Sequence, residues 1–99
     1  MSQPIAVVAV VEAKPEFIAQ TQAEIQTCIK LTRQEKGCLL YTCHKDLDTP
    51  GRFVFIEKWT SIGALSEHQN TPHFLALAEA FKTYLAAPLQ ASVLEELEA

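Results

Sequence analysis

Two histidines, His68 and His73, are the side chains in this 99-residue sequence best suited to moving a proton. Imidazole has an unperturbed pKa of roughly 6.5, so it gains or loses a proton at small cost near neutral pH. Glu57 and Trp59 lie in the same stretch, Arg52 to Phe74, together with several aromatic residues. A lone histidine more often packs or lies on the surface, but this cluster keeps an acid–base interpretation open beside that one.

Aromatic side chains in and near this stretch predict a pocket for a flat aromatic ligand. Tyr41 and Trp59 each carry a polar group that needs a partner when buried, so they are the stronger pocket candidates. Phe55 and Phe74 are predicted to line the same pocket. For Phe55, as for Phe53, plain packing in the core is the simpler interpretation.

Glu57 interrupts an otherwise apolar strand and has two interpretations. It is either a carboxylate in the pocket or an ion-pair partner, for example of Lys58 or of Arg52 in a second subunit. A structural role is favoured, and Glu57 is kept among the predicted pocket residues.

Cys38, Cys43 and His44 suggest a metal site by residue type but not by spacing. Residues five apart on a regular strand face opposite sides, so the two thiols are not expected to share a tetrahedral site. Cys43 as a nucleophile would need a base beside it, and nothing in the sequence supplies one. We therefore expect no metal site, and thiols that pack as small core residues.

The motifs that would hold an organic cofactor are absent. The sequence has no glycine-rich phosphate loop, no flavin or nicotinamide fingerprint and no nucleophile elbow, and three glycines are too few for a dinucleotide cradle. The net charge of −4 argues against a general nucleic-acid surface. Any redox activity is expected to run without a tightly bound cofactor.

The cysteine count and the N-terminus bear on the compartment. Three cysteines with no disulfide framework favour a reducing environment. The apolar run from Ile5 to Val11 follows no basic residue and is far shorter than the roughly 20 residues that span a bilayer. We expect a cytoplasmic protein that does not enter the membrane.

Hydrophobic periodicity and turn residues predict seven elements. Period-two runs indicate strands, and spacings of three, four and seven indicate amphipathic helices. Gly37 is expected to end the first helix in a left-handed conformation, and Pro88 to stop the last one. The expected elements are strand 5–13, helix 16–36, a hairpin of strands 38–45 and 52–59, a short helix that runs to about 69, helix 72–87 and a weaker final strand 91–98. Thr60 or Ser61 is expected to cap the short helix. Thr71 is expected to cap the helix 72–87, with Pro72 in its first turn.

This order, β-α-β-β-α-α-β, predicts one ferredoxin-like α+β domain over residues 1–99, with its core at about 5–97 and a four-stranded antiparallel sheet. Helices can cover only one face of that sheet. The first and third strands nevertheless carry apolar residues on both faces. Because monomers rarely expose a large apolar patch, we expect a homodimer formed by sheet-to-sheet packing.

Four motifs along the chain resemble the antibiotic biosynthesis monooxygenase family, and among its members the small quinol-monooxygenase-like proteins. The motifs are Gly37-Cys38-x-x-Tyr41, Pro50-x-Arg52-Phe53, Ile56-Glu57-x-Trp59 and Leu65-x-x-His68-x-x-Thr71-Pro72-His73-Phe74.

This resemblance implies a dimeric α/β barrel with a pocket between sheet and helices in each subunit. It further implies that a small phenol or hydroquinone is deprotonated and reacts with O2 without metal or flavin, with His68 or His73 as the base and Trp59 and Tyr41 orienting the ring. Members that degrade haem use an Asn on the first strand, and the stretch from Ile5 to Ala13 has none.

Two other functions stay open. One is an isomerase or degradation enzyme for a small phosphorylated carbonyl compound, which would use the same histidines and would need basic residues near the pocket. The other is a non-catalytic dimeric ligand-binding or stress-response module whose pocket residues are simply core. Fold and family alone do not decide between them.

Overall fold

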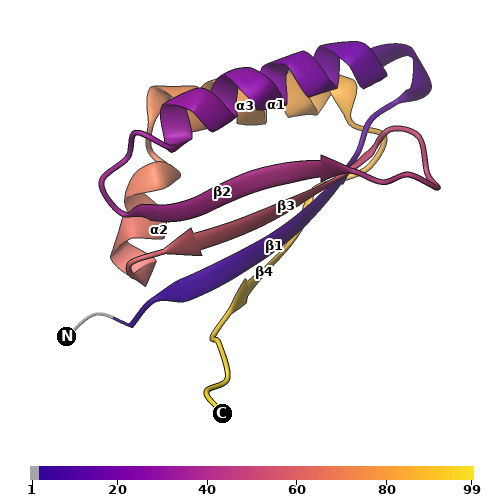
Figure 1. The fold of residues 1–99 in the computed structure, drawn as a ribbon. Coiled ribbons are helices and arrows are strands. Elements are labelled where there is room, and N and C mark those ends of the chain that lie inside the picture. The colour runs from indigo at the N-terminus through magenta and orange to yellow at the C-terminus, as the bar shows by residue number, and fades with distance from the viewer. Residues whose placement is uncertain (1–2) are drawn as a thin grey trace.

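The alternating apolar runs form strands and the amphipathic stretches form helices in the computed structural model, which describes residues 3–99 (Figure 1). The predicted element order and the ferredoxin-like α+β arrangement are confirmed. In chain order the elements are β1 (Ile5–Glu12), the 3-10 turn η1 (Pro15–Phe17), α1 (Ile18–Thr32), β2 (Cys38–Lys45), β3 (Arg52–Trp59), α2 (Ile62–His68), α3 (Pro72–Tyr84) and β4 (Gln90–Leu94).

The four strands form one antiparallel sheet in the order β2-β3-β1-β4. All the helices lie on one face of it, with α1 and α3 running along the sheet and α2 at the end where β3 finishes (Figure 1). Within residues 3–99 the other face carries no helix. It therefore remains open in the single chain, as the sequence predicted.

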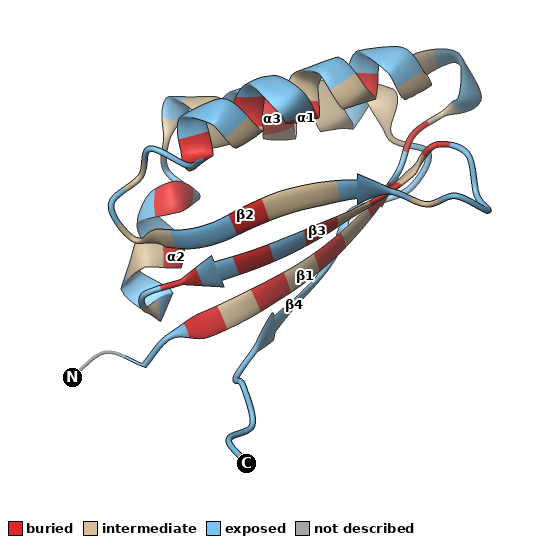
Figure 2. Cartoon of the chain, viewed as in Figure 1, coloured by how far each residue is buried: buried red, intermediate tan, exposed pale blue. Residues whose placement is uncertain are grey.

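β1 and β3 alternate between buried and less buried residues, whereas β4 is exposed along its whole length (Figure 2). The buried set faces the helices and forms the core. The opposite set is apolar too, and we call it the open face: Ala6, Val8, Val10, Leu40, Val54, Ile56 and Leu94. Several of its members are well exposed, including Ile56 at 39%.

The first helix is shorter than predicted at both ends. Residues 15–17 form the separate turn η1, and α1 ends at Thr32 rather than Lys36. Gly37 was expected in a left-handed conformation, but Gly51 is the glycine with positive φ, at 88°. Gly37 is needed for a different reason, because a Cβ there would collide with the side chain of Ala64 on α2.

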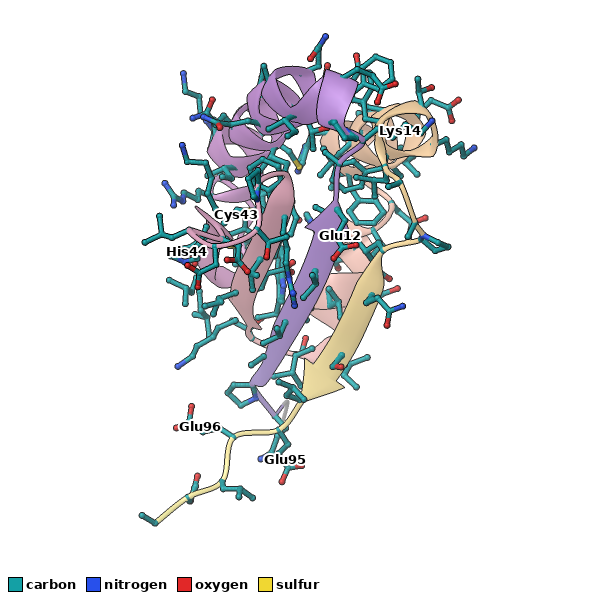
Figure 3. The ribbon with its side chains drawn as sticks, turned by 90° about the vertical axis from the view of Figure 1, so that its right-hand side faces the viewer. Glu12, Lys14, Cys43, His44, Glu95 and Glu96 are labelled. Atoms are coloured by element: carbon teal, nitrogen blue, oxygen red, sulfur yellow. The ribbon has the colours of Figure 1, made fainter. Side chains whose placement is uncertain are left out.

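The last helix and the last strand also end early. α3 stops at Tyr84 because Leu85 is already extended and bridges to Ala13 beside β1. β4 ends at Leu94, and the following segment, with Glu95 and Glu96, leaves the sheet (Figure 3). It is an edge strand, paired to β1 on one side.

The prediction that Cys38 and Cys43 face opposite sides was wrong. A β-bulge between Cys38 and Leu40 shifts the register of β2 against β3. Cys38 pairs with Trp59 and Cys43 with Phe55, two core residues, so the thiols share the helix-covered face. Both pack against the core as small apolar residues, as expected.

No helix within residues 3–99 is long and apolar enough to cross a membrane.

Candidate active site

The two histidines are held by the junction between α2 and α3. His68 is the last residue of α2, and His73 is the second residue of α3. Between them, the hydroxyl of Thr71 donates to the His68 carbonyl at 2.7 Å and accepts from the Phe74 N–H at 3.2 Å. One side chain thus ends one helix, caps the next and fixes the spacing of both imidazoles.

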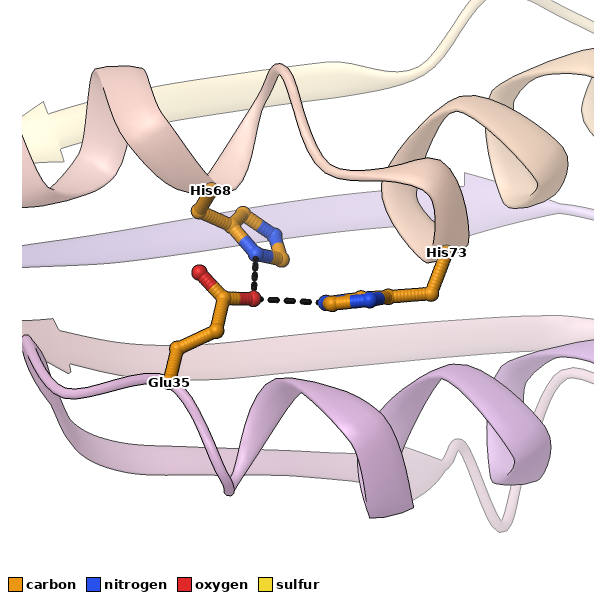
Figure 4. Close-up of side chains that lie close together, drawn as sticks. All are labelled: Glu35, His68 and His73. Carbon is orange, nitrogen blue, oxygen red and sulfur yellow. Dashed lines mark hydrogen bonds and ion pairs between the residues drawn. The ribbon is translucent and has the colours of Figure 1, made fainter.

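Glu35, in the turn after α1, connects the two histidines (Figure 4). Its Oε2 accepts a hydrogen bond from His68 Nδ1 at 2.7 Å and another from His73 Nε2 at 2.6 Å. Glu35 and His73 are partly exposed, whereas His68 is buried at 1% exposure. The turn after α1, the end of α2 and the start of α3 are therefore connected through one carboxylate oxygen.

Aromatic rings surround His68. Its ring lies 4.6 Å from that of Trp59, between centroids, with the planes inclined by 35°. Phe74 approaches edge-on at 5.0 Å and Tyr41 lies at 5.5 Å. Burial in this cluster lowers the pKa of His68, and the neighbouring Glu35 carboxylate opposes that effect.

A cavity of about 550 Å³ lies between the sheet and α3, within the size range of small-molecule sites. The chain from Leu85 to Leu89 closes one side of it. Its wall is mainly apolar, with Tyr41, Phe55 and Glu57 from the sheet and Phe74, Leu77 and Phe81 from α3.

Glu57 is the carboxylate on the cavity wall. It is 6% exposed, and its Oε1 accepts a hydrogen bond from Trp59 Nε1 at 2.9 Å. Burial raises the pKa of Glu57, and the Trp59 hydrogen bond opposes this in part. Burial also raises the pKa of Tyr41 far above its ordinary value, so this hydroxyl stays protonated.

The predicted site residues fall into two adjoining groups. Tyr41, Phe55, Glu57 and Phe74 line the cavity. Trp59, His68 and His73 do not, and His68 lies behind the rings of Tyr41 and Phe74. Within the chain Glu57 bonds to Trp59, while Lys58 pairs with Glu96 and Arg52 with Asp46.

Sequence reasoning missed Glu35. It lies in a polar turn 33 residues before His68, and charged residues in such turns are usually solvated. The one available signal was its place next to the Gly37-Cys38 motif, which fixes where that turn meets the end of the sheet.

Glu35, His68 and His73 are also the residues that could hold a metal ion. Their ligand atoms lie within 4.8 Å of one another, and two imidazoles with one carboxylate make a donor set that zinc and iron accept. In the chain as it stands, the same atoms are used in hydrogen bonds to each other.

The family model described as antibiotic biosynthesis monooxygenase matches residues 4–80. The chain belongs to the antibiotic biosynthesis monooxygenase family. This confirms the resemblance read from the four motifs.

Relatives within the family extend over nearly the whole chain. A Mycobacterium tuberculosis protein named "Putative monooxygenase" is 32% identical over 98 residues, covering 99% of this chain and 96% of that protein. An uncharacterized Synechocystis protein is 32% identical over 90 residues, but this chain spans only 61% of its length.

Solved structures of the family agree with the fold. The Mycobacterium tuberculosis protein superimposes with a TM-score of 0.92 at 31% identity, covering 98% of each chain. A Pseudomonas aeruginosa protein has the same TM-score at 32% identity, covering 99% of this chain and 98% of that one.

Proposed function

We propose that this chain is a cofactor-independent monooxygenase that oxidises a quinol or polyphenol-type aromatic compound with O2. The observation that carries the proposal is the apolar cavity with two polar groups on its wall, Tyr41 and Glu57, beside the hydrogen-bonded histidines. A flat ring fits the apolar wall, and its hydroxyl groups need polar partners of this kind.

The reaction balances without a bound redox group. A hydroquinone and O2 give a hydroxyquinone and water, so the substrate supplies all the electrons. Removing a phenolic proton makes the ring electron-rich enough to reduce O2. The protein's task is then to orient the ring, exclude water and accept that proton, a contribution of about 10²–10⁴-fold for general base catalysis.

His68, His73 and Glu57 are the candidates for the proton acceptor. The sequence predicts His68 or His73, and His68 contacts Tyr41 and Phe74 on the cavity wall. These rings separate His68 from the cavity, so direct proton transfer to it requires them to move. Glu57 already lines the cavity, and burial raises its pKa, so it is the alternative to the histidines.

Charge at the cavity favours the oxygenase over the phosphate-dependent isomerase. A phosphate group needs convergent cations or backbone N–H groups. Lys82 is the one basic residue among those lining the cavity in residues 3–99, and its side chain is 74% exposed and paired with Glu79 at 3.0 Å.

We also propose that two copies pair through the open face. Apolar side chains cover this face on all four strands, from Leu40 on β2 to Leu94 on β4. Packing two such faces together would remove them from water and leave both cavities, on the opposite side of each sheet, accessible.

The test is oxygen consumption by metal-stripped protein with a panel of hydroquinones. Wild type is compared with His68→Asn, His73→Asn and Glu57→Gln, and with Glu67→Gln, at an exposed position on α2, as control. Uptake that falls about 10²-fold or more in one of the first three variants, with circular dichroism unchanged, supports the proposal and identifies the proton acceptor. Uptake no greater than autoxidation across the panel contradicts it.

A further inference from the structure

We propose that Glu35 is the positioning residue that fixes the tautomers of His68 and His73 and so joins them into one unit. In this unit His68 carries its proton on Nδ1 and His73 on Nε2, and the opposite nitrogen of each ring is free to take a proton. The tautomers are properties of the free protein. Their effect on turnover rests on the function proposed above.

The tautomers follow from the shared acceptor. A carboxylate only accepts hydrogen bonds, so each ring nitrogen facing Glu35 Oε2 must carry a hydrogen. For His68 this is the Nδ1–H form, which is the minor tautomer of neutral imidazole in water. Distances of 2.7 and 2.6 Å are those of charge-assisted hydrogen bonds, which hold each ring in one orientation.

Charge balance explains why the unit needs Glu35. A lone imidazolium packed against the rings of Trp59, Tyr41 and Phe74 would be costly, because little water reaches it. With the Glu35 carboxylate in contact, one added proton makes the three groups neutral in total. Both rings use the same oxygen, so one carboxylate balances one proton and not two.

The other groups around His68 do not provide this balance. The titratable side chains that face it are Glu35 from the turn after α1, His73 from α3 and Tyr41 from β2, with Glu57 of β3 behind the Trp59 ring. Tyr41 stays protonated, and Glu57 is hydrogen-bonded to Trp59 instead. Glu35 is therefore the residue whose removal separates the two histidines.

Nuclear magnetic resonance can read the tautomers directly. The chain has three histidines, so long-range ¹H–¹⁵N spectra of ¹⁵N-labelled protein are simple, and the His44→Asn and His73→Asn variants together assign each ring. We expect the Nδ1–H form for His68 and the Nε2–H form for His73.

Two variants of Glu35 distinguish the effect of its hydrogen bonds from the effect of its charge. Glu35→Ala should release His68 to the Nε2–H form that predominates in water. Glu35→Gln keeps an acceptor oxygen without the charge, so both tautomers should be retained. Glu67→Gln, an exposed glutamate one residue before His68, is the matched control and should behave as wild type.

Three results would overturn the proposal. They are an Nε2–H tautomer at His68 in the wild type, an Nδ1–H tautomer at His73 in the wild type, or unchanged tautomers in Glu35→Ala. Stoichiometric binding of added Zn²⁺ at neutral pH, with both rings metal-ligated, would also overturn it, because the unit would then be a metal site.

Steady-state kinetics distinguish the proposed role of Glu35 from the proposed oxygenase function. If the oxygenase reaction occurs, Glu35→Gln should lower kcat by roughly 10²-fold with little change in KM, and move the acid limb of the pH profile. An inactive wild type with the expected tautomers would refute the oxygenase function and leave the role of Glu35 intact. An active Glu35→Gln enzyme with an unchanged pH profile would refute the role of Glu35.

Discussion

Gly37 lies directly against Ala64, so the turn after α1 and the first turns of α2 meet with no room for a side chain between them. The Gly37 carbonyl also accepts a hydrogen bond from the Thr60 N–H at 2.9 Å. Glu35 is two residues away on the same turn. This close approach therefore brings the Glu35 carboxylate within reach of the histidine at the other end of α2.

Gly37→Ala is expected to destabilise the protein by about 1–3 kcal/mol, because the new methyl group overpacks against Ala64. Urea denaturation measures this, and the His68 ring signals should shift in the same variant. Gly63→Ala is the matched control. A methyl group there meets only Ser61 Oγ at 3.6 Å, and helix propensity favours Ala by up to about 1 kcal/mol. Equal changes in the free energy of unfolding for Gly37→Ala and Gly63→Ala would contradict the close packing of Gly37 against Ala64.

Glu57→Gln is expected to raise Tm at pH 7. Burial raises the pKa of Glu57 above its ordinary value of 4.5, so the folded protein binds this proton more tightly than the unfolded chain does. Stability from this group is therefore fully present below pH 4.5 and is lost as pH rises through the folded-state pKa. Gln keeps an acceptor for Trp59 Nε1 and carries no charge to bury.

Thermal melts between pH 4 and pH 8 test the direction of this pH dependence of stability. The advantage of Glu57→Gln over wild type should grow with pH and disappear in acid. Glu67→Gln, at an exposed position on α2, should melt like wild type throughout. A Glu57→Gln protein that melts lower than wild type at pH 7 would mean that the ionised carboxylate is stabilising.

Ile56→Lys on the open face is expected to weaken the proposed homodimer at least about tenfold, because a charge would be buried among apolar side chains. Analytical ultracentrifugation over a dilution series measures the dissociation constant. Leu31→Lys is the control, since Leu31 is similarly exposed, at 42%, but lies on α1, away from the open face. Wild type that sediments as a monomer at all concentrations would refute the dimer.

The thiols are expected to resist alkylation in the folded protein. Burial raises the pKa of Cys43 to about 12, so about one thiol in ten thousand is ionised at pH 8. Cys28 is buried and its pKa is raised for the same reason. Mass spectrometry after iodoacetamide treatment should find both unmodified until urea unfolds the chain. Rapid labelling of native Cys43 would instead indicate a reactive thiol.

Local signals were sufficient for most of the fold. Alternating runs predicted β1 and β3 almost to the residue, and Thr71 followed by Pro72 predicted the start of α3. Errors occurred where tertiary contacts override local preference. α1 ends four residues early to form the turn that carries Glu35, and α3 ends early because Leu85 bridges to Ala13.

The candidate site was predicted in composition but not in arrangement. His68 and His73 were expected to turn towards the sheet end that holds Trp59, and the His68 ring lies beside the rings of Trp59 and His73. A period-two pattern could not reveal the bulge after Cys38, which places Tyr41 opposite Glu57 and both thiols on the core face. A bulge adds one residue without changing the apolar character of a strand, so the sequence pattern hardly records it.

The sequence by itself determined the element order, the apolar open face and the two imidazoles beside an aromatic cluster, because periodicity, capping and residue type are local properties. Only the tertiary structure decided that Glu35 bonds to both histidines and that Glu57, not His68, faces the cavity. Both depend on how closely Gly37 and Ala64 pack and on how α3 lies over the sheet. Such long-range contacts follow from the packing of the whole core rather than from any single stretch of sequence.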